Sequence, residues 1–233
     1  MLDDVKLDYK QKLKATIESF PRELIINGEG YTDEKITASA IVCVDKNNAI
    51  GYKNKLVVKS RFDMKVFKTF TMNKIVIMGR NTFESMNKKP LPYRLNVVVT
   101  TNRDYDAGEY KDFVLVLNSL DIVFNKRKFV EALLFKFGFV PKVDDNIVLI
   151  GGASIYTEIL ARDLIDKFIV DIVDYEAPNA DAYFDGSYLA SKGFKPSAVF
   201  HKTAKEIREL NDLSIYILEK DPKPVKNYRE LSV

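Results

Sequence analysis

From residue 36 onward, the sequence alternates short runs rich in β-branched residues with stretches of helical periodicity. This alternation constrains the fold most, because strands joined by helices form a largely parallel sheet that helices cover. The predicted strands lie at 38–45, 74–78, 95–100, 113–117, 146–150, 167–173, 196–203 and 213–219. The predicted helices of this region lie at 61–72, 80–86, 126–137 and 154–161.

The last two strand runs are separated by residues 204–212, which show no clear helical pattern. Strands joined without a helix pair in antiparallel fashion, whereas parallel strands need a longer crossover. We therefore expect an α/β fold with a central mixed sheet of about eight strands. The sheet should be mostly parallel with an antiparallel C-terminal edge, and helices should cover both faces.

An amphipathic helix is predicted at residues 4–20, ahead of the β-rich region. Its apolar stripe repeats every three or four residues and consists of Val5, Tyr9, Leu13, Ile17 and Phe20. Pro21 should end this helix, and residues 27–30 (Asn-Gly-Glu-Gly) should form a turn. We expect the stripe to pack on the main domain or on a second subunit, which would make a homo-oligomer.

The chain therefore divides into an N-terminal helical extension (1–36), a main domain (37–220) and a C-terminal tail (221–233). The residues that bear predicted site chemistry all follow position 40. For this reason we expect the N-terminal helix to lie away from the site.

Two glycine turns follow strand ends, one at Gly79 and one at Gly151-Gly152. Each should open a helix, and a helix N-terminus carries free N–H groups and partial positive charge. Arg80 and Thr82 add a charge and a hydroxyl beside the first turn. Two such turns in one α/β domain suggest a ligand with an extended polyphosphate, although either turn alone is more often a simple tight turn.

Asp63 lies in the first turn of the predicted helix at 61–72, one turn before Phe67. Residues four apart share a helix face, so a flat heterocycle could stack on Phe67 and donate two N–H groups to Asp63. The alternative is that Asp63 only stabilises the helix N-terminus. An Asn-rich loop at 45–56 follows the first strand and could cover a ligand.

The charge balance fits a mildly basic cleft for an anionic small molecule better than a nucleic-acid-binding surface. The net charge is +3 with interspersed signs, which does not suggest nucleic-acid binding. Cys43 is the only cysteine, the N-terminus is acidic, and no apolar run approaches the roughly 18 residues that span a bilayer. We expect a cytoplasmic protein without membrane contact, and no metal site, because His201 is the only histidine.

Taken together, these segments resemble the dihydrofolate reductase family over residues 38–220. The resemblance depends on these segments: 48–56 (NAIGYKNKL), 62–68 (FDMKVFK), 76–85 (VIMGRNTFES), 90–94 (PLPYR), 150–156 (IGGASIY), 181–184 (DAYF) and 214–218 (SIYIL). It implies reduction of 7,8-dihydrofolate to 5,6,7,8-tetrahydrofolate with NADPH. The cofactor would give a hydride to pterin C6, and N5 would take a proton.

The resemblance also implies roles for individual residues. Asp63 would be the catalytic acid beneath the pterin, and Arg94 would clamp the glutamate carboxylate of the substrate. The remaining substrate-binding residues would be Met64, Phe67, Leu91, Ile150, Tyr156 and Asp171. The cofactor-binding residues would be Cys43, Ile50, Asn54, Lys55, Leu56, Gly79, Arg80, Asn81, Thr82, Thr100, Thr101, Arg103, Gly151, Gly152, Ala153, Ser154 and Ile155.

The chain departs from the family pattern at several positions. Val58 stands where the family usually has a tryptophan, Arg61 lies near the usual proline, and Ala153 replaces a glycine. Asp171 is the best match to a threonine that normally bonds the acid, so either it is turned away from Asp63 or the two acids share a proton. The alternatives are a same-fold reductase of another heterocycle, such as the riboflavin-pathway pyrimidine reductases, or a non-enzymatic protein with this fold.

Overall fold

The computed structural model describes residues 2–22 and 36–220. The chain forms two compact units that each combine separate stretches of sequence. Unit 1 comprises Met1–Thr37 with Thr71–Val148, and unit 2 comprises Ala38–Phe70 with Leu149–Val233. Each unit therefore contains part of the predicted main domain.

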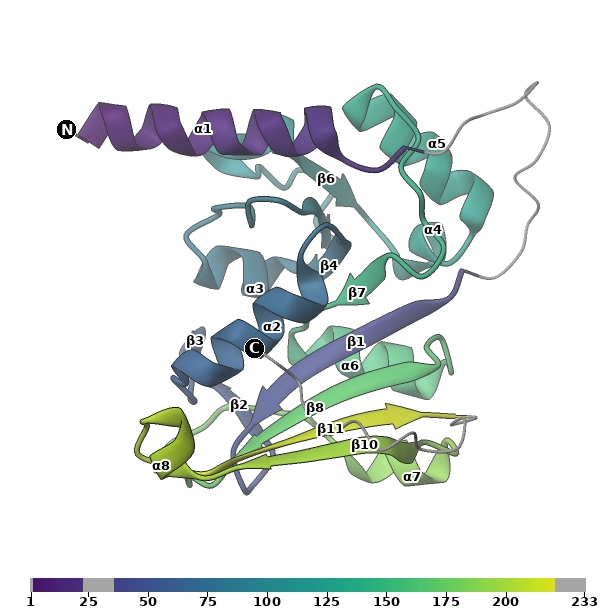
Figure 1. Cartoon of the computed structure of the whole chain (residues 1–233). Helices are drawn as coiled ribbons and strands as arrows, with labels where there is room; N and C mark the ends of the chain where they lie inside the picture. Colours follow the sequence, from purple (N-terminus) through teal and green to yellow (C-terminus); the bar gives the residue numbers. More distant parts are fainter. Residues whose placement is uncertain (1, 23–35, 221–233) are drawn as a thin grey trace. The chain divides into compact units, whose positions relative to one another are not determined.

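Unit 1 begins with the long helix α1 (Leu2–Ser19), shown in purple in Figure 1. Its other elements are β4 (Ile75–Gly79), α3 (Arg80–Ser85), β5 (Leu95–Val99), the 3-10 helix η1 (Gly108–Phe113), β6 (Val114–Leu117), α4 (Leu120–Val123), α5 (Lys126–Phe137) and most of β7 (Ile147–Leu149). All five residues of β4 are buried, as expected for a central parallel strand with an uninterrupted apolar run.

Unit 2 carries the first strand and the C-terminal half of the chain. Its elements are β1 (Ala38–Val44), β2 (Ala49–Tyr52), β3 (Lys55–Leu56), α2 (Arg61–Thr71, whose last residue lies in unit 1), α6 (Ala153–Ala161), β8 (Lys167–Val173), β9 (Ala182–Tyr183), α7 (Ser187–Ser191), β10 (Lys195–Lys202), α8 (Ala204–Ile207) and β11 (Leu213–Glu219).

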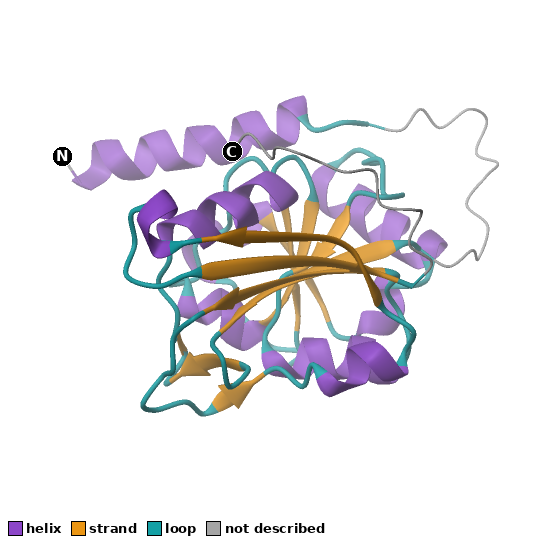
Figure 2. Ribbon diagram, turned by 60° about the horizontal axis from the view of Figure 1, so that its bottom comes forward, coloured by secondary structure: helices purple, strands orange, loops and turns teal. Residues whose placement is uncertain are grey.

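Eight strands form one sheet in the order β10-β11-β8-β1-β7-β4-β5-β6, and helices surround it (Figure 2). The pairs β1/β8, β4/β5 and β5/β6 are parallel, whereas β8/β11 and β10/β11 are antiparallel. The predicted fold class is confirmed, including the antiparallel hairpin at the C-terminal edge.

Helix α1 packs on unit 1 through the predicted apolar stripe. Leu13 and Phe20 are buried, and the Tyr9 ring meets Tyr110 of η1 at 5.3 Å between centroids. The helix ends at Ser19, just before Pro21, as predicted. The side chain of Val5, the turn at 27–30 and the tail at 221–233 lie outside the described residues.

The structure contains several short elements that were not predicted, among them η1, α4, α7 and β9, and it corrects two further segments. The expected loop at 45–56 contains a hairpin of β2 and β3, which joins β9 in a second sheet of order β3-β2-β9. The segment 204–212 begins with α8, because Thr203 and Glu206 form a capping box that pairs the backbone N–H of each with the side chain of the other. The Thr-x-x-Glu spacing was a detectable signal for this helix.

Candidate active site

Asp63 occupies the first turn of α2 in unit 2. Ser60 begins this helix: its Oγ accepts the Asp63 N–H at 3.0 Å, and its carbonyl accepts the Met64 N–H at 3.2 Å. Asp63 is only 6% exposed, so its carboxyl group lies in a largely desolvated setting. The predicted helix and the position of the acid on it are both present.

Asp171 lies on β8, directly beside Cys43 of the parallel strand β1. Its side chain is fully buried, and among the described residues neither carboxyl oxygen meets an N–H or hydroxyl donor. The group within hydrogen-bonding reach is the carboxyl group of Asp63. Asp171 is therefore not turned away from Asp63, and one of the two expected arrangements is excluded.

Burial raises the pKa of both acids. For Asp171, the negative charge of Asp63 and the hydrogen bond to Asp63 raise the pKa further. For Asp63, the hydrogen bonds from Asp171 and Cys43 oppose the effect of burial. Two carboxyl groups in contact strongly disfavour the state in which both are ionised, so the pair holds one proton. Because the pKa of Asp171 is raised further, Asp171 holds this proton and donates it to the Asp63 carboxylate.

Cys43 joins this acid pair. Burial and the nearby charges of Asp63 and Asp171 raise the pKa of its thiol, so the sulfur keeps its proton and can donate to Asp63. The structure thus brings Asp63, Asp171 and Cys43 together, from a helix and two neighbouring strands. We call these three residues the acid cluster.

Glu209 was not among the predicted site residues, yet it contacts the helix that carries Asp63. Its Oε1 accepts the Phe62 N–H at 2.7 Å and so satisfies a free donor at the start of α2. The charge of Glu209 also raises the pKa of Asp63. No local pattern could reveal this contact, because 147 residues separate Glu209 from Phe62.

A groove of about 640 Å³ lies beside the start of α2. It is lined by residues 57–61, Val173, Tyr175 and residues 208–211, so it includes both Ser60 and Glu209. Val58, which stands at the position of the usual tryptophan, is buried and lines this groove. Arg61, also a departure from the family pattern, is an exposed lining residue.

The other predicted substrate residues of unit 2 differ in exposure. Met64 is exposed, Phe67 and Ile150 are half-buried, and Tyr156 is buried. The Tyr156 hydroxyl donates to the Ile41 carbonyl at 2.7 Å, so its polar group already has a partner. Tyr156 also explains the glycine at position 151.

Gly151 has a φ of +105°, and an added Cβ would lie 2.8 Å from the Tyr156 hydroxyl oxygen. A side chain at this position would be both strained and too close to the tyrosine. The turn after β7 therefore depends on glycine. The following helix α6 begins at Ala153 with no side-chain cap on its first turn.

These features fit the phosphate groups of a dinucleotide. An uncapped helix of nine residues offers N–H donors to an anion, and Gly152, Ala153 and Ser154 lie at its start. Ile155, also predicted here, is buried in the same helix. In unit 1, Gly79 ends β4 and α3 likewise begins without a side-chain cap.

The remaining predicted cofactor residues lie at strand ends or in the hairpin. Arg80 pairs with Glu84 at 3.2 Å on the surface of α3, near Asn81 and Thr82. Thr100 is buried after β5 and accepts the Asn102 N–H, while Thr101 and Arg103 are exposed. Ile50 is buried in β2, and Asn54, Lys55 and Leu56 are exposed along the β2–β3 hairpin.

Arg94 is held in unit 1 by two hydrogen bonds. Its Nε donates to the Thr71 Oγ1 at 2.9 Å, and its Nη1 donates to the Pro92 carbonyl at 2.8 Å. Asn96, which was not predicted as a site residue, accepts the Leu91 N–H at 2.8 Å and donates to the carbonyls of Leu91 and Arg94. The loop that carries Leu91 and Arg94 is thus fixed by side chains of the unit.

Helix α1 lies beside the loop that carries two predicted site residues, whereas we expected it to lie away from the site. Thr16 accepts the Tyr93 N–H at 2.8 Å, and the Tyr9 hydroxyl donates to the Pro90 carbonyl. Both partners belong to the loop that carries Leu91 and Arg94. The distance along the sequence did not indicate this contact, because tertiary packing brings α1 next to a loop about 80 residues later in the chain.

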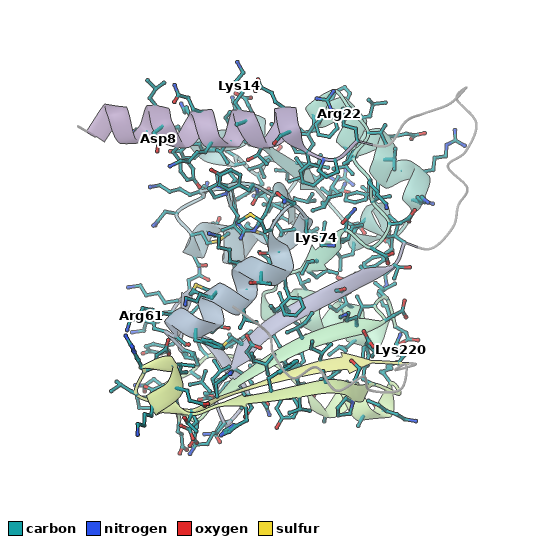
Figure 3. The ribbon with its side chains drawn as sticks, in the orientation of Figure 1. Asp8, Lys14, Arg22, Arg61, Lys74 and Lys220 are labelled. Atoms are coloured by element: carbon teal, nitrogen blue, oxygen red, sulfur yellow. The ribbon has the colours of Figure 1, made fainter. Side chains whose placement is uncertain are left out.

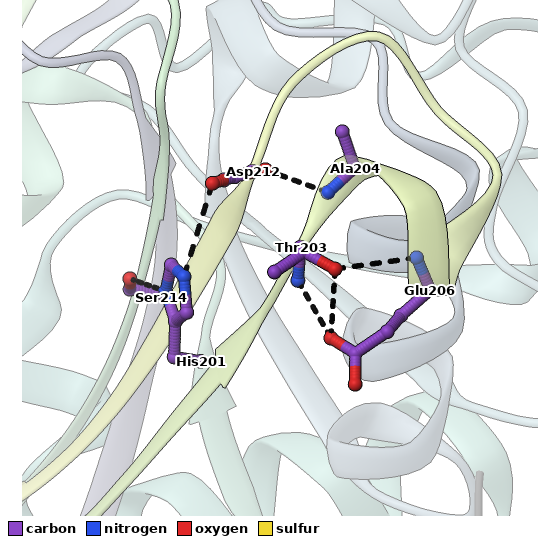
Figure 4. A network of polar contacts seen from close by, with 6 residues as sticks. All are labelled: His201, Thr203, Ala204, Glu206, Asp212 and Ser214. Carbon is purple, nitrogen blue, oxygen red and sulfur yellow. Dashed lines mark hydrogen bonds and ion pairs between the residues drawn. The ribbon is translucent and has the colours of Figure 1, made fainter.

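His201 lies in a surface network of polar contacts (Figure 4). Its Nδ1 lies 3.0 Å from the Ser214 Oγ, and its Nε2 lies 3.8 Å from Asp212, which in turn accepts the Ala204 N–H. The parts of the chain that the structure describes contain no cluster of three metal-ligating side chains. Within residues 2–22 and 36–220, no helix has the length and apolar character needed to cross a bilayer.

The mostly parallel sheet and its glycine turns before uncapped helices are features of α/β proteins that bind nucleotides. Comparison with known proteins specifies the family. The sequence profile named "Dihydrofolate reductase" matches residues 37–209. The chain belongs to the dihydrofolate reductase family.

Similar proteins support this assignment. A dihydrofolate reductase of Buchnera aphidicola is 35% identical over 146 residues, which cover 63% of this chain and 77% of the relative. A bifunctional dihydrofolate reductase-thymidylate synthase of Paramecium tetraurelia is 37% identical over 127 residues, 54% of this chain but only 24% of that protein. The chain thus matches about a quarter of the bifunctional relative.

A solved structure of the Enterococcus faecalis dihydrofolate reductase, complexed with NADP(H) and RAB-propyl, has a TM-score of 0.61 with 24% identity. The match covers 80% of this chain and 97% of that structure, and it confirms the predicted fold. The family assignment confirms the predicted enzyme class, an NADPH-dependent dihydrofolate reductase, and does not favour the pyrimidine-reductase and non-enzymatic alternatives.

Proposed function

We propose that this chain reduces 7,8-dihydrofolate to 5,6,7,8-tetrahydrofolate, with the acid cluster as the pterin-binding and proton-holding group. The observation that carries the proposal is the contact between the buried carboxyl groups of Asp63 and Asp171. When bound, NADPH supplies the hydride that reaches pterin C6. The chain's own residues orient the substrate, exclude water and control the charge near N5.

Asp63 acts as the acceptor in this arrangement. Its carboxylate receives the 2-amino group and a ring N–H of the pterin in a bidentate bond, and its negative charge favours a proton on N5. The low exposure of Asp63 supports this role, because a charge interacts more strongly with a ligand where water is largely excluded.

Asp171 performs the task of the usual threonine in a different chemical form. A protonated carboxyl group is a neutral O–H donor, as a hydroxyl group is. Asp171 can therefore hydrogen bond to the Asp63 carboxylate without adding a second negative charge. The pair then carries one negative charge in total, which is the charge of a lone catalytic acid. On this basis the Asp171 replacement is compatible with activity.

The other ligand groups have separate candidate sites. Arg94 receives the glutamate α-carboxylate of the substrate, because its planar guanidinium can bind both carboxylate oxygens. Gly152, Ala153 and Ser154 at the start of α6 receive the pyrophosphate, and Arg103 receives the 2′-phosphate. The uncapped start of α6 and the exposure of Arg103 support these roles.

A spectrophotometric assay tests the proposal. Purified full-length chain should cause loss of the NADPH absorbance band only when dihydrofolate is present. The Asp63→Asn variant, with the shape of the acid but no charge, is the matched control and should be nearly inactive at neutral pH. Wild-type protein that binds NADPH but leaves dihydrofolate unreduced between pH 5 and 8 would overturn the proposal.

We also propose the predicted division of the chain into an extension (1–36), a catalytic domain (37–220) and a tail (221–233). The family match over residues 37–209 supports the middle range. A homo-oligomer through α1 and a cytoplasmic location stay predictions. Light scattering of the pure protein and cell fractionation test these two points.

A further inference from the structure

Helix α1 makes two polar contacts with the loop at 90–94. The Tyr9 hydroxyl donates to the Pro90 carbonyl, and the Thr16 Oγ1 accepts the Tyr93 N–H at 2.8 Å. The Tyr9 contact lies two residues before Pro92, which is half-buried. The Thr16 contact lies one residue before Arg94, which is buried. The extension therefore contacts the backbone of the loop and not only its apolar surface.

The loop has a conformation that needs such support. Tyr93 has a φ of +60°, in the left-handed region that is unfavourable for a bulky residue. Its N–H is bound by Thr16, and its carbonyl accepts the Asn73 N–H at 2.9 Å. Thr16 is itself 3% exposed and donates to the Lys12 carbonyl, so its hydroxyl has a fixed direction.

Tyr9 lies close to Arg94 as well as to Pro90. Burial raises the pKa of the Tyr9 phenol to about 12, with Tyr110 adding to the rise and Arg94 opposing it. The phenol therefore stays neutral and keeps its proton for the Pro90 carbonyl over the whole physiological range. The ring is fixed by its edge-on contact with Tyr110.

We propose that α1 is a specificity-determining element for the substrate tail, in which Tyr9 and Thr16 position the loop that presents Arg94 to a carboxylate. This inference rests on the proposed carboxylate-binding role of Arg94. The chemical class that α1 selects is a dihydropterin with an acidic tail, as opposed to a dihydropterin without one. Neither Tyr9 nor Thr16 needs to touch the reacting atoms.

The variants Tyr9→Phe and Thr16→Val, in the full-length chain, test the inference. Each removes one hydroxyl and keeps the shape of the side chain. We expect the KM for dihydrofolate to rise about five- to tenfold, because this change corresponds to the loss of one hydrogen bond that positions a charged group. The kcat and the KM for NADPH should stay within about twofold of wild type.

The decisive comparison uses a 7,8-dihydropterin that lacks the glutamyl group. Its kcat/KM should be unchanged in both variants, because it has no carboxylate for Arg94. Thr16→Ser keeps the hydroxyl and should restore the wild-type KM for dihydrofolate. Lys14→Ala is the control on the same helix: Figure 3 labels Lys14 on the upper side of α1, and its side chain is 75% exposed.

The inference is overturned if both variants keep the wild-type KM for dihydrofolate, or if the tail-less substrate is affected equally. Lowered thermal stability without a change in KM would also refute it, since α1 would then be only a packing element. Calorimetric binding of dihydrofolate to the same variants distinguishes the two proposals. A wild-type chain that binds dihydrofolate but does not reduce it refutes the proposed activity. The calorimetric comparison of the variants then still tests the role of α1.

Discussion

The carboxyl group of Asp171 lies close enough to the carboxyl group of Asp63 for the two to interact directly, and both are almost completely removed from solvent. This contact places a titrating pair at the proposed pterin site. Because one proton must be shared, both the stability of the protein and its activity should depend on pH in ways that single substitutions can separate.

The contribution of Asp171 to the stability of the wild-type protein should fall as the pH rises from about 4 to about 9. The pKa of Asp171 rises from 3.8 to about 9 in the folded chain, mainly through burial. In this window the folded state holds a proton that the unfolded chain has lost, so folding takes up a proton. Asp171→Asn cannot ionise and should raise the free energy of unfolding at pH 8 by about 2–4 kcal/mol.

Denaturant unfolding at pH 5 and pH 8 measures this effect. The difference between Asp171→Asn and wild type should shrink at the lower pH, where both unfolded chains approach the same charge. A constant difference at the two pH values would mean that Asp171 does not carry the shared proton.

Asp63→Asn should lower kcat at pH 7 by about 10²-fold or more, since the amide keeps the shape but loses the charge that favours a protonated pterin. The loss should become smaller toward pH 5, where solvent protonates more of the substrate. Steady-state rates across pH 5–8 provide the measurement. An unchanged rate at pH 7 would remove Asp63 from the mechanism.

Arg94→Lys should weaken folate binding by about 1.5–3 kcal/mol, because a single ammonium cannot replace a bidentate clamp. It would also lose the pair of bonds to Thr71 and Pro92. NADPH binding should be nearly unaffected. Calorimetry with each ligand tests the assignment, and Arg127→Lys, on the exposed surface of α5, serves as the control. Equal weakening of both ligands would contradict the proposed role.

Gly151→Ala should destabilise the fold by about 2–4 kcal/mol, because it adds both a positive-φ penalty and a steric clash. The new Cβ would lie 2.8 Å from the Tyr156 hydroxyl oxygen. Gly193→Ala is a matched control, since Gly193 has a φ of +82° but no atom within 4 Å of an added Cβ. Thermal unfolding should show a clearly larger loss for Gly151→Ala than for Gly193→Ala, and equal losses would exclude the clash.

Much of the fold could be predicted from local sequence patterns. The apolar run that forms β4 and the glycine after it specify a buried strand followed by a turn. The stripe of α1 and the position of Pro21 likewise fix where that helix ends. The two-residue strand β3 and the four-residue helix α8 were missed, because elements this short have almost no periodicity to detect.

The sequence by itself determined the family, the strands of the sheet, the place of Asp63 on its helix and the two glycine turns, since each depends on residues close together in the chain. Only the tertiary structure decided that Asp171 faces Asp63, that Glu209 caps α2 and that Tyr9 contacts the loop of Arg94. These contacts join residues that are 81 to 147 positions apart in the sequence and belong to separate elements. Their energies come from burial and shared protons, which exist only once the chain is packed.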